Sequence, residues 1–210
     1  MHRSDDELSD GVVDFFLRRF EEDGLRDTGR CMLLDAQWFA KARSDTQAVV
    51  GWSKTAHILD KDFVYVPMNE QRHWVGAILC RCAPARYRIL LVDSLHGKRQ
   101  SPFRAKPAGE LIARVVKQTW QHRRPNEASP HVDWIVVKGV PVQPNWVDCA
   151  LYMLMCFSKH NAALPALHLQ RAPSWEAALR FNQAAISRMR VELRQTIEWL
   201  ARNQRERVLG

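Results

Sequence analysis

Cys149 stands where a loop meets a long apolar run, in the stretch QPNWVDCALYML (143–154). A catalytic cysteine must be a thiolate near neutral pH, whereas a free cysteine, with a pKa of about 8.5, is mostly protonated. The N-terminal end of a helix and a neighbouring imidazolium both favour the thiolate. The apolar residues after Cys149 predict a buried helix that begins there, so the sequence supplies the first of these devices.

The second device requires a histidine, and the chain has eight. Most lie in polar or loop contexts, but His73 opens the apolar stretch HWVGAILC (73–80), and Asp93 lies near the end of the next one, LLVDSL (90–95). If the two stretches are antiparallel neighbours, the end of one lies beside the start of the other, and Asp93 can orient the His73 imidazole. Taken singly, each residue has a plainer interpretation, a structural histidine at a strand end and an acid that caps a turn.

Acyl transfer also needs hydrogen-bond donors where negative charge develops. The backbone N–H of Cys149 is one candidate, and the side-chain amide of Gln143, six residues earlier, is another. A solvated loop residue is the alternative interpretation of Gln143. Along the chain the candidates follow in the order His73, Asp93, Gln143 and Cys149. Papain-like enzymes place the cysteine before the histidine, so this is a different arrangement of a thiol site.

Hydrophobic periodicity indicates the elements that must position these residues. Three stretches joined by short turn-forming connectors predict a meander of antiparallel strands. The helix that begins near Cys149 is apolar almost all round, which is typical of a buried helix. The predicted class is α+β, with a central, mostly antiparallel sheet, a buried helix that bears Cys149 and further helices around it. The predicted strands are 63–68, 73–82, 87–95 and 133–142, and the predicted helices are 7–23, 107–122, 148–160 and 174–203, with a short helix or turn within 33–43. Ser9 or Asp10 can cap the start of the first helix.

Length and composition favour one folded domain. The 210 residues suit a single domain over 1–210, and the 46% hydrophobic content is too high for a disordered chain. No apolar run approaches the ~20 residues that span a bilayer, and the acidic start MHRSDDELSD does not resemble a signal peptide. We therefore expect an intracellular protein without membrane contact, in the nucleus or the cytoplasm.

The cysteines and the charges are also informative. Five cysteines without regular spacing do not predict a disulfide framework or a metal site, so we expect no metal and no other cofactor. Residues 1–60 carry 8 Lys and Arg against 12 Asp and Glu, and the rest carry 23 against 11. The basic part indicates a solvated face, or else a surface that attracts an acidic partner. Nucleic acid is not expected, because no nucleic-acid motif is present, and we expect a monomer.

The motif order resembles that of the sentrin/SUMO-specific cysteine proteases, the Ulp-type peptidases, whose clan also holds the deneddylases and the adenoviral protease. The family signatures are HW at the base, YDS or VDS at the acid and Q-N-x-x-DCG at the nucleophile. Here they read His73-Trp74, Val92-Asp93-Ser94 and QPNWVDCA (143–150). ELSDGVVDFF (7–16) resembles the family's N-terminal WLND pattern, and the stretch from Val50 to Trp74 resembles the segment that leads to the catalytic histidine. The resemblance runs from about residue 6 to 202.

This resemblance implies a thiol protease that cuts after the C-terminal Gly-Gly of SUMO or a related modifier. It implies four catalytic roles: general base for His73, orienting acid for Asp93, nucleophile for Cys149 and oxyanion donor for Gln143. It also implies that Trp74 forms a wall of the narrow tunnel that accepts Gly-Gly, and that Asp10 contacts the body of the modifier. The residues alone favour a core tryptophan, because in a regular strand the Trp74 side chain points opposite to that of His73.

Two residues depart from the family pattern. Ala150 replaces the usual glycine after the nucleophile, which a helix accepts readily at a negative φ. Glu7 replaces the tryptophan of WLND, which in the family packs against the modifier tail. The identity of the modifier therefore stays open, and a viral, bacterial-effector or protozoan member, delivered into a host cell in the effector case, fits such divergence.

Three other functions compete with a SUMO protease. A deubiquitinase or deneddylase of the same fold would use the same site on another modifier. Some bacterial effectors of similar fold are acetyltransferases with a similar Cys-His-acid set, but they usually carry Glu at the acid position, and Asp93 together with Gln143 favours proteolysis. A non-catalytic modifier-binding module would not need a complete triad.

Overall fold

The computed structural model describes residues 8–25, 29–98, 101–167 and 179–209. The chain divides into two compact units, Met1–Arg180 and Phe181–Gly210. The first unit holds the sheet, the helices that cover it and every candidate site residue, and the second holds one long helix. The single domain expected over 1–210 stays a prediction.

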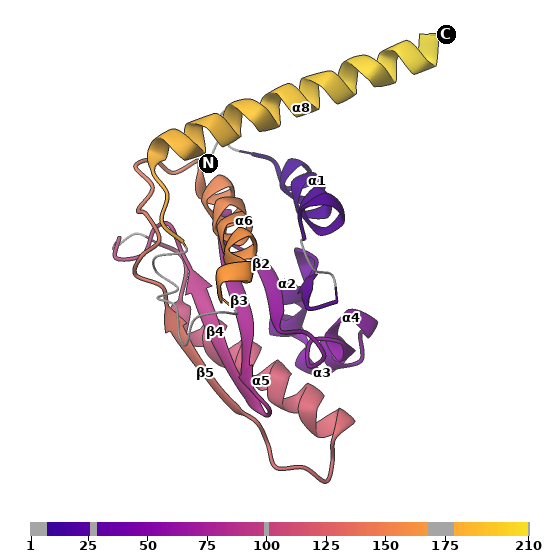
Figure 1. The fold of residues 1–210 in the computed structure, drawn as a ribbon, viewed down its shortest axis with the longest axis vertical. Helices are drawn as coiled ribbons and strands as arrows, with labels where there is room; N and C mark the ends of the chain where they lie inside the picture. The colour runs from indigo at the N-terminus through magenta and orange to yellow at the C-terminus, as the bar shows by residue number, and fades with distance from the viewer. Residues whose placement is uncertain (1–7, 26–28, 99–100, 168–178, 210) are drawn as a thin grey trace. The chain divides into compact units, whose positions relative to one another are not determined.

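Five strands of the first unit form one sheet in the order β1-β2-β3-β4-β5 (Figure 1). The three central strands pair antiparallel, as the predicted meander requires, whereas each outer strand runs parallel to its neighbour. The predicted α+β class with a mostly antiparallel sheet is therefore confirmed. The strands are β1 (Cys31–Leu33), β2 (Phe63–Glu70), β3 (His73–Ala83), β4 (Arg86–Val92) and β5 (His131–Val136).

One face of the sheet carries the main hydrophobic core. Alternate residues of the central strands, such as Val66, Ala77 and Leu91, pack there against buried side chains of the covering helices, including Trp38 and Val115. The helices on this face are α2 (Gln37–Ser44), α3 (Thr46–Val50), α4 (Ser53–Ala56) and α5 (Ala105–Arg123).

The opposite face carries the helix that begins at the candidate nucleophile. This helix is α6 (Cys149–Leu167), and α1 (Asp10–Arg19) with its continuation η1 (Phe20–Gly24) packs beside it. The ring of Tyr65 on β2 contacts the rings of Phe157 and Phe20, with centroids 5.2 and 5.4 Å apart. A Cβ at Gly76 of β3 would lie 2.6 Å from the Phe157 ring, so α6 approaches β3 closely only because Gly76 has no side chain. The prediction that this helix is buried is confirmed.

Several predicted boundaries are wrong. The fourth strand, expected to reach residue 142, ends at Val136, and the strand expected over 87–95 ends at Val92. The cap of the first helix is confirmed, because the helix begins at Asp10 and the Ser9 side chain accepts from the Val12 N–H (3.4 Å). Strand β1 and helices α3 and α4 were not predicted from the sequence, because each has only three to five residues.

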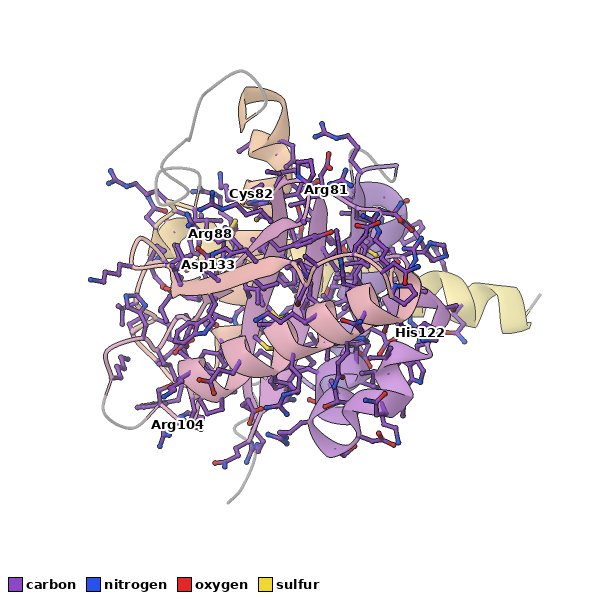
Figure 2. All side chains as sticks on the ribbon, turned by 90° about the horizontal axis from the view of Figure 1, so that it is seen from below. Arg81, Cys82, Arg88, Arg104, His122 and Asp133 are labelled. Atoms are coloured by element: carbon purple, nitrogen blue, oxygen red, sulfur yellow. The ribbon has the colours of Figure 1, made fainter. Side chains whose placement is uncertain are left out.

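A side-chain ion pair joins the parallel strands β4 and β5. Arg88 and Asp133 lie next to each other on these strands (Figure 2), and the guanidinium donates from Nη2 to Oδ2 (2.7 Å) and from Nε to both carboxylate oxygens, Oδ1 (3.1 Å) and Oδ2 (3.2 Å). The hydrogen bond and the charge of Arg88 lower the pKa of Asp133 below its usual value despite partial burial. This carboxylate therefore stays charged near neutral pH.

The second unit is the helix α8 (Gln183–Leu209). It begins later than the predicted residue 174, because the Asn182 side chain caps it by accepting from the Ala185 N–H (3.0 Å), and the predicted residues 174–178 lie outside the described ones. Val191 and Trp199 are more than half exposed on it. Among the described residues, no helix of either unit is long and apolar enough to cross a membrane.

Candidate active site

The β2–β3 hairpin places His73 at the edge of the sheet. Glu70 pairs with His73, and the two residues between them, Gln71 and Arg72, have positive φ values of 51° and 70°. Such values are uncommon for residues other than glycine. The Asn69 side chain stabilises the turn by accepting from the Arg72 N–H (3.0 Å). This tight turn, stabilised by Asn69, therefore fixes the position of the histidine that follows it.

His73 and Asp93 lie side by side, as the antiparallel meander predicts. The imidazole Nε2 is 2.7 Å from Asp93 Oδ1, and both side chains are buried. The carboxylate also accepts from the Leu95 N–H (2.8 Å) and from the Ser101 hydroxyl (3.4 Å). A buried carboxylate with several donors is held in one orientation, so Asp93 fixes the plane of the imidazole.

Cys149 is the first residue of α6 and meets the same hairpin. The Asp148 carbonyl accepts the first helical hydrogen bond, from Tyr152 N–H (3.0 Å), which makes Asp148 the N-cap. The Cys149 sulfur lies 4.0 Å from the carbonyl oxygen of Arg72. The backbone N–H of Cys149 has no partner within the helix, because the first four N–H groups of any α-helix have none.

The His73 imidazole is favoured in its charged form. Burial disfavours the imidazolium and lowers the pKa of His73, but hydrogen bonds to the Asp93 and Cys149 side chains, together with the negative charges of both groups, raise this pKa to about 9. Because Nε2 points to Asp93, Nδ1 is the ring nitrogen that can exchange a proton with Cys149. The arrangement therefore keeps the His73 imidazole charged within reach of the Cys149 side chain.

Gln143 is fully buried, with 0% of its surface exposed, so its interpretation as a solvated loop residue is wrong. Its backbone N–H donates to the Ser94 carbonyl (2.9 Å), and its side-chain oxygen accepts from the Ser94 hydroxyl. Its amide Nε2 donates to the Asn145 carbonyl (2.7 Å). The hydrogen bond from Ser94 to the amide oxygen thus fixes the orientation of the Gln143 side-chain amide.

The two candidate substrate-binding residues, Trp74 on β3 and Asp10 at the start of α1, both adjoin Asn69 of β2. Trp74 pairs with Asn69, whose side-chain amide donates to Asp10 Oδ1 (3.3 Å) at the start of α1. The pairing of β3 is regular from its first residue, which puts Trp74 on the same face as Gly76 and therefore on the α6 side. Trp74 is only 4% exposed, and Asp10 is exposed. Of the two departures from the family pattern, Ala150 is buried in the first turn of α6, and Glu7 lies outside the described residues.

Sequence reasoning gave no role to several residues that hold the site together, although Ser94 and Asn145 stand in the quoted family signatures. Ser94 and Ser101 anchor Gln143 and Asp93, and Lys98 donates to the Gln143 carbonyl (2.7 Å). Asn145 accepts from the Val147 and Asp148 N–H groups (3.1 Å each) and donates to Asp148 Oδ2 (2.7 Å). The pattern Asn-x-x-Asp before the helix is a recognisable loop-and-cap signal, whereas the contacts of Ser101 and Lys98 depend on loop positions that no local pattern predicts.

Within the described ranges, no group of three or more His, Cys, Asp or Glu side chains is arranged to hold a metal ion. The five cysteines are all free thiols, and only Cys82 is exposed. Burial raises the pKa of the Cys156 thiol, which lies on the same helix as Cys149, well above its usual value. Cys156 is therefore a neutral core residue at physiological pH.

The fold is similar to that of known modifier-specific proteases. A de-sumoylating protease superposes with a TM-score of 0.70 at 16% identity, over 96% of this chain and 85% of that one. The SUMO protease Ulp1, with its catalytic cysteine oxidised to a sulfinic acid, gives 0.62 at 20% identity, over 88% and 74%. The Xanthomonas campestris effector protein XopD, in a structure bound to ubiquitin, gives 0.57 at 15% identity, over 92% and 93%. At these identities the likeness shows the fold.

Sequence comparison finds relatives in plants and nematodes. A probable ubiquitin-like-specific protease 2A of Arabidopsis thaliana is 22% identical over 86% of this chain and 25% of its own length, and ubiquitin-like protease 4 of Caenorhabditis elegans is 23% identical over 69% and 36%. The chain thus spans about a quarter to a third of the length of these relatives. The family model described as "Ulp1 protease family, C-terminal catalytic domain" matches residues 6–198, nearly the whole chain. The resemblance in motif order is therefore confirmed, and the chain belongs to the Ulp1 protease family.

Proposed function

We propose that this chain is a thiol protease and isopeptidase that cleaves after the C-terminal Gly-Gly of SUMO or a related ubiquitin-like modifier. The observation that carries the proposal is the line of three buried side chains, Cys149 at the start of α6, His73 at the start of β3 and Asp93 after β4. Membership of the Ulp1 family supports the same reaction class.

The proposed reaction has two halves. The Cys149 thiolate attacks the carbonyl carbon of the terminal glycine, and the His73 imidazolium gives its proton to the leaving amine as the C–N bond breaks, which leaves a thioester on Cys149. Neutral His73 then takes a proton from a water molecule that attacks the thioester. The C–S bond breaks, the modifier leaves as a carboxylic acid that loses its proton to solvent, and the imidazolium–thiolate pair is restored. Asp93 orients the imidazole in both halves.

The oxyanion of each tetrahedral intermediate would accept from two donors. One is the Cys149 backbone N–H at the N-terminus of α6, where the helix dipole also favours negative charge. The other is the Gln143 side-chain amide, whose Nε2 carries two hydrogens and uses one for the Asn145 carbonyl. Because Ser94 holds the amide oxygen, the second N–H is presented in a fixed direction.

Gln143→Ala is expected to lower kcat by about 10²-fold with little change in KM, because loss of one oxyanion donor affects the transition state and not the bound ground state. Steady-state kinetics on a modifier with a C-terminal aminocoumarin amide would measure both constants. Ser94→Ala is the matched variant, since it frees the amide oxygen and should give a smaller loss of kcat. A raised KM with unchanged kcat in Gln143→Ala would make Gln143 a binding residue instead.

The modifier tail would reach Cys149 from the β2 side of the site. Trp74 lies on the α6 face of β3, close to where α6 begins, and Asp10 is exposed beside it at the start of α1. In this proposal Trp74 forms one wall of a tunnel too narrow for side chains, which selects Gly-Gly, and Asp10 contacts the body of the modifier.

A panel of modifiers whose C-terminal carboxylate is replaced by a thiol-reactive group would test the proposal and identify the modifier. We expect SUMO, ubiquitin or another ubiquitin-like protein to form a covalent adduct on Cys149, located by mass spectrometry of peptides. Tails that end in Gly-Ala or Ala-Gly should react far more slowly, because a Cβ would clash with the wall. If no modifier labels Cys149, the proposed function is wrong. If tails that end in Gly-Ala or Ala-Gly label Cys149 as fast as Gly-Gly, the proposed Gly-Gly specificity is wrong.

The remaining expectations belong to the same proposal. We expect one domain over 1–210 that acts as a monomer on conjugates inside a cell, in the nucleus or the cytoplasm. The similarity to the effector XopD supports delivery into a host cell as the alternative origin.

A further inference from the structure

The loop that leads into Cys149 alternates between buried anchors and exposed apolar side chains. Gln143 and Asp148 are buried, whereas Val142 is 48% and Trp146 is 53% exposed. The exposed indole of Trp146 lies three residues before the proposed nucleophile. Tryptophan usually packs in the core or at an interface with a partner, and Trp146 is not in the core. Its place on this loop makes it a candidate for substrate contact.

Trp146 is displayed on a fixed backbone. On one side, the Gln143 amide donates to the Asn145 carbonyl (2.7 Å), and on the other, the Asn145 side chain accepts from the Val147 and Asp148 N–H groups. The Lys98 ammonium lies 5.3 Å from the centre of the indole ring and donates to the Gln143 carbonyl (2.7 Å). A rigid aromatic surface loses little conformational entropy when a partner binds to it.

The strand order places Trp146 opposite the proposed modifier side. Across the sheet edge at the site, β2 carries Asn69 with its contact to Asp10, β3 carries His73, and β4 ends at Asp93. The loop that contains Gln143 lies next to the end of β4, because the Gln143 backbone N–H donates to the carbonyl of Ser94, the residue after Asp93. The catalytic pair thus lies between the Asp10 side and the Trp146 side.

The two parts of a conjugate bind on either side of the scissile bond. If the modifier occupies the Asp10 side, the target protein to which it is joined extends toward the side that holds Lys98 and Trp146. We propose that Trp146, with Lys98 packed over its ring, is a platform that binds an apolar side chain of the target protein next to the lysine to which the modifier is joined. This inference rests on the proposed function, and it adds a residue that selects among targets, since the indole carries no group that could act as acid or base.

The test uses the modifier whose probe labels Cys149 most strongly. Two substrates join this modifier to different leaving groups. One substrate carries a small aminocoumarin, and the other an isopeptide-linked peptide with leucine beside the acceptor lysine. Trp146→Ala is expected to raise KM for the leucine peptide about tenfold, with little change in kcat. The ratio of kcat/KM for the peptide to that for the coumarin should fall by the same factor.

Three controls make the result specific. Trp146→Phe should retain most of the preference, because a ring remains. Trp199→Ala removes a tryptophan that is 57% exposed on α8, and should leave both substrates unaffected. A second peptide has serine in place of leucine. The wild type should cleave it less efficiently than the leucine peptide, whereas Trp146→Ala should cleave the two peptides with equal efficiency. Thermal melting of every variant would check that each is folded.

The outcomes separate this inference from the proposed function. If the wild type forms no adduct with any modifier tail, the proposed function fails and this inference with it. If the wild type labels and cleaves, but Trp146→Ala lowers the coumarin and peptide rates by the same factor, the function stands and the platform is overturned. A preference for leucine that persists in Trp146→Ala would also overturn it.

Discussion

Cys149→Ala is expected to reduce turnover to the background rate, a loss of more than about 10⁴-fold, because alanine offers no nucleophile and the proposed reaction proceeds through a thioester on Cys149. The protein should stay folded and still bind its modifier. Alanine is the best helix former, and the buried Cβ keeps its place in the first turn of α6. Single-turnover cleavage of the aminocoumarin substrate measures the loss, and calorimetric titration with the free modifier measures binding.

Cys156→Ala is the matched control for this prediction. Cys156 lies on the same helix, two turns further along, and is equally buried. Its thiol is held neutral, because burial raises its pKa. Its replacement should lower the melting temperature slightly and keep kcat/KM near the wild-type value. Comparable turnover by Cys149→Ala in a preparation free of other proteases would remove Cys149 as the nucleophile.

How far the sequence predicts this fold depends on element length. The strands over 63–92 carry enough alternating β-branched and aromatic residues to define the meander, and the apolar run after Cys149 defines a buried helix. Strand β1 has three residues, too few to show a period, and pairs with β2 only through contacts distant in sequence. The early end of β5 at Val136 also has a tertiary cause, because residues 137–148 turn toward the site.

Some residues of the site are likewise predictable from the sequence, and others depend on tertiary contacts. His73 and Asp93 are predictable because each lies at a strand end and the antiparallel meander brings such ends together. The burial of Gln143 is not predictable from its loop composition, since it depends on Ser94 and Lys98 from another segment. The exposure of Trp146 is likewise unexpected, because a tryptophan before a buried helix is more often a core residue. Local patterns therefore identify the candidate catalytic side chains, and the tertiary structure is needed to find the residues that hold them in position.

Asp93→Asn is expected to lower kcat by about 10³–10⁴-fold, although asparagine has nearly the same size. The carboxylate can only accept a hydrogen bond, which keeps a proton on His73 Nε2 and directs Nδ1 toward Cys149. An amide can turn its NH₂ toward Nε2, which favours the wrong tautomer, and it removes the negative charge that stabilises the imidazolium. Glu at this position would keep the charge, so Asp93→Glu should recover part of the loss if the longer side chain can reach the ring.

The pH dependence provides a second, independent readout of the same interaction. In the wild type, the hydrogen bond and charge of Asp93, with those of Cys149, outweigh burial and raise the pKa of His73 to about 9. The proton that the leaving amine needs is therefore present below this pH and is lost above it, so kcat/KM should fall as the pH rises through about 9.

The same shift predicts how folding stability depends on pH. The folded pKa of His73 lies above its ordinary value of 6.5, so the imidazolium stabilises the folded protein fully below pH 6.5, and this contribution is lost as the pH rises through about 9. In Asp93→Asn, the pH at which residual activity falls should move below that of the wild type, and the stabilisation between pH 6.5 and 9 should shrink. Residual activity against pH and thermal melting against pH measure the two effects. An upper pH limit that stays near 9 in Asp93→Asn would show that Asp93 does not hold the charge of His73.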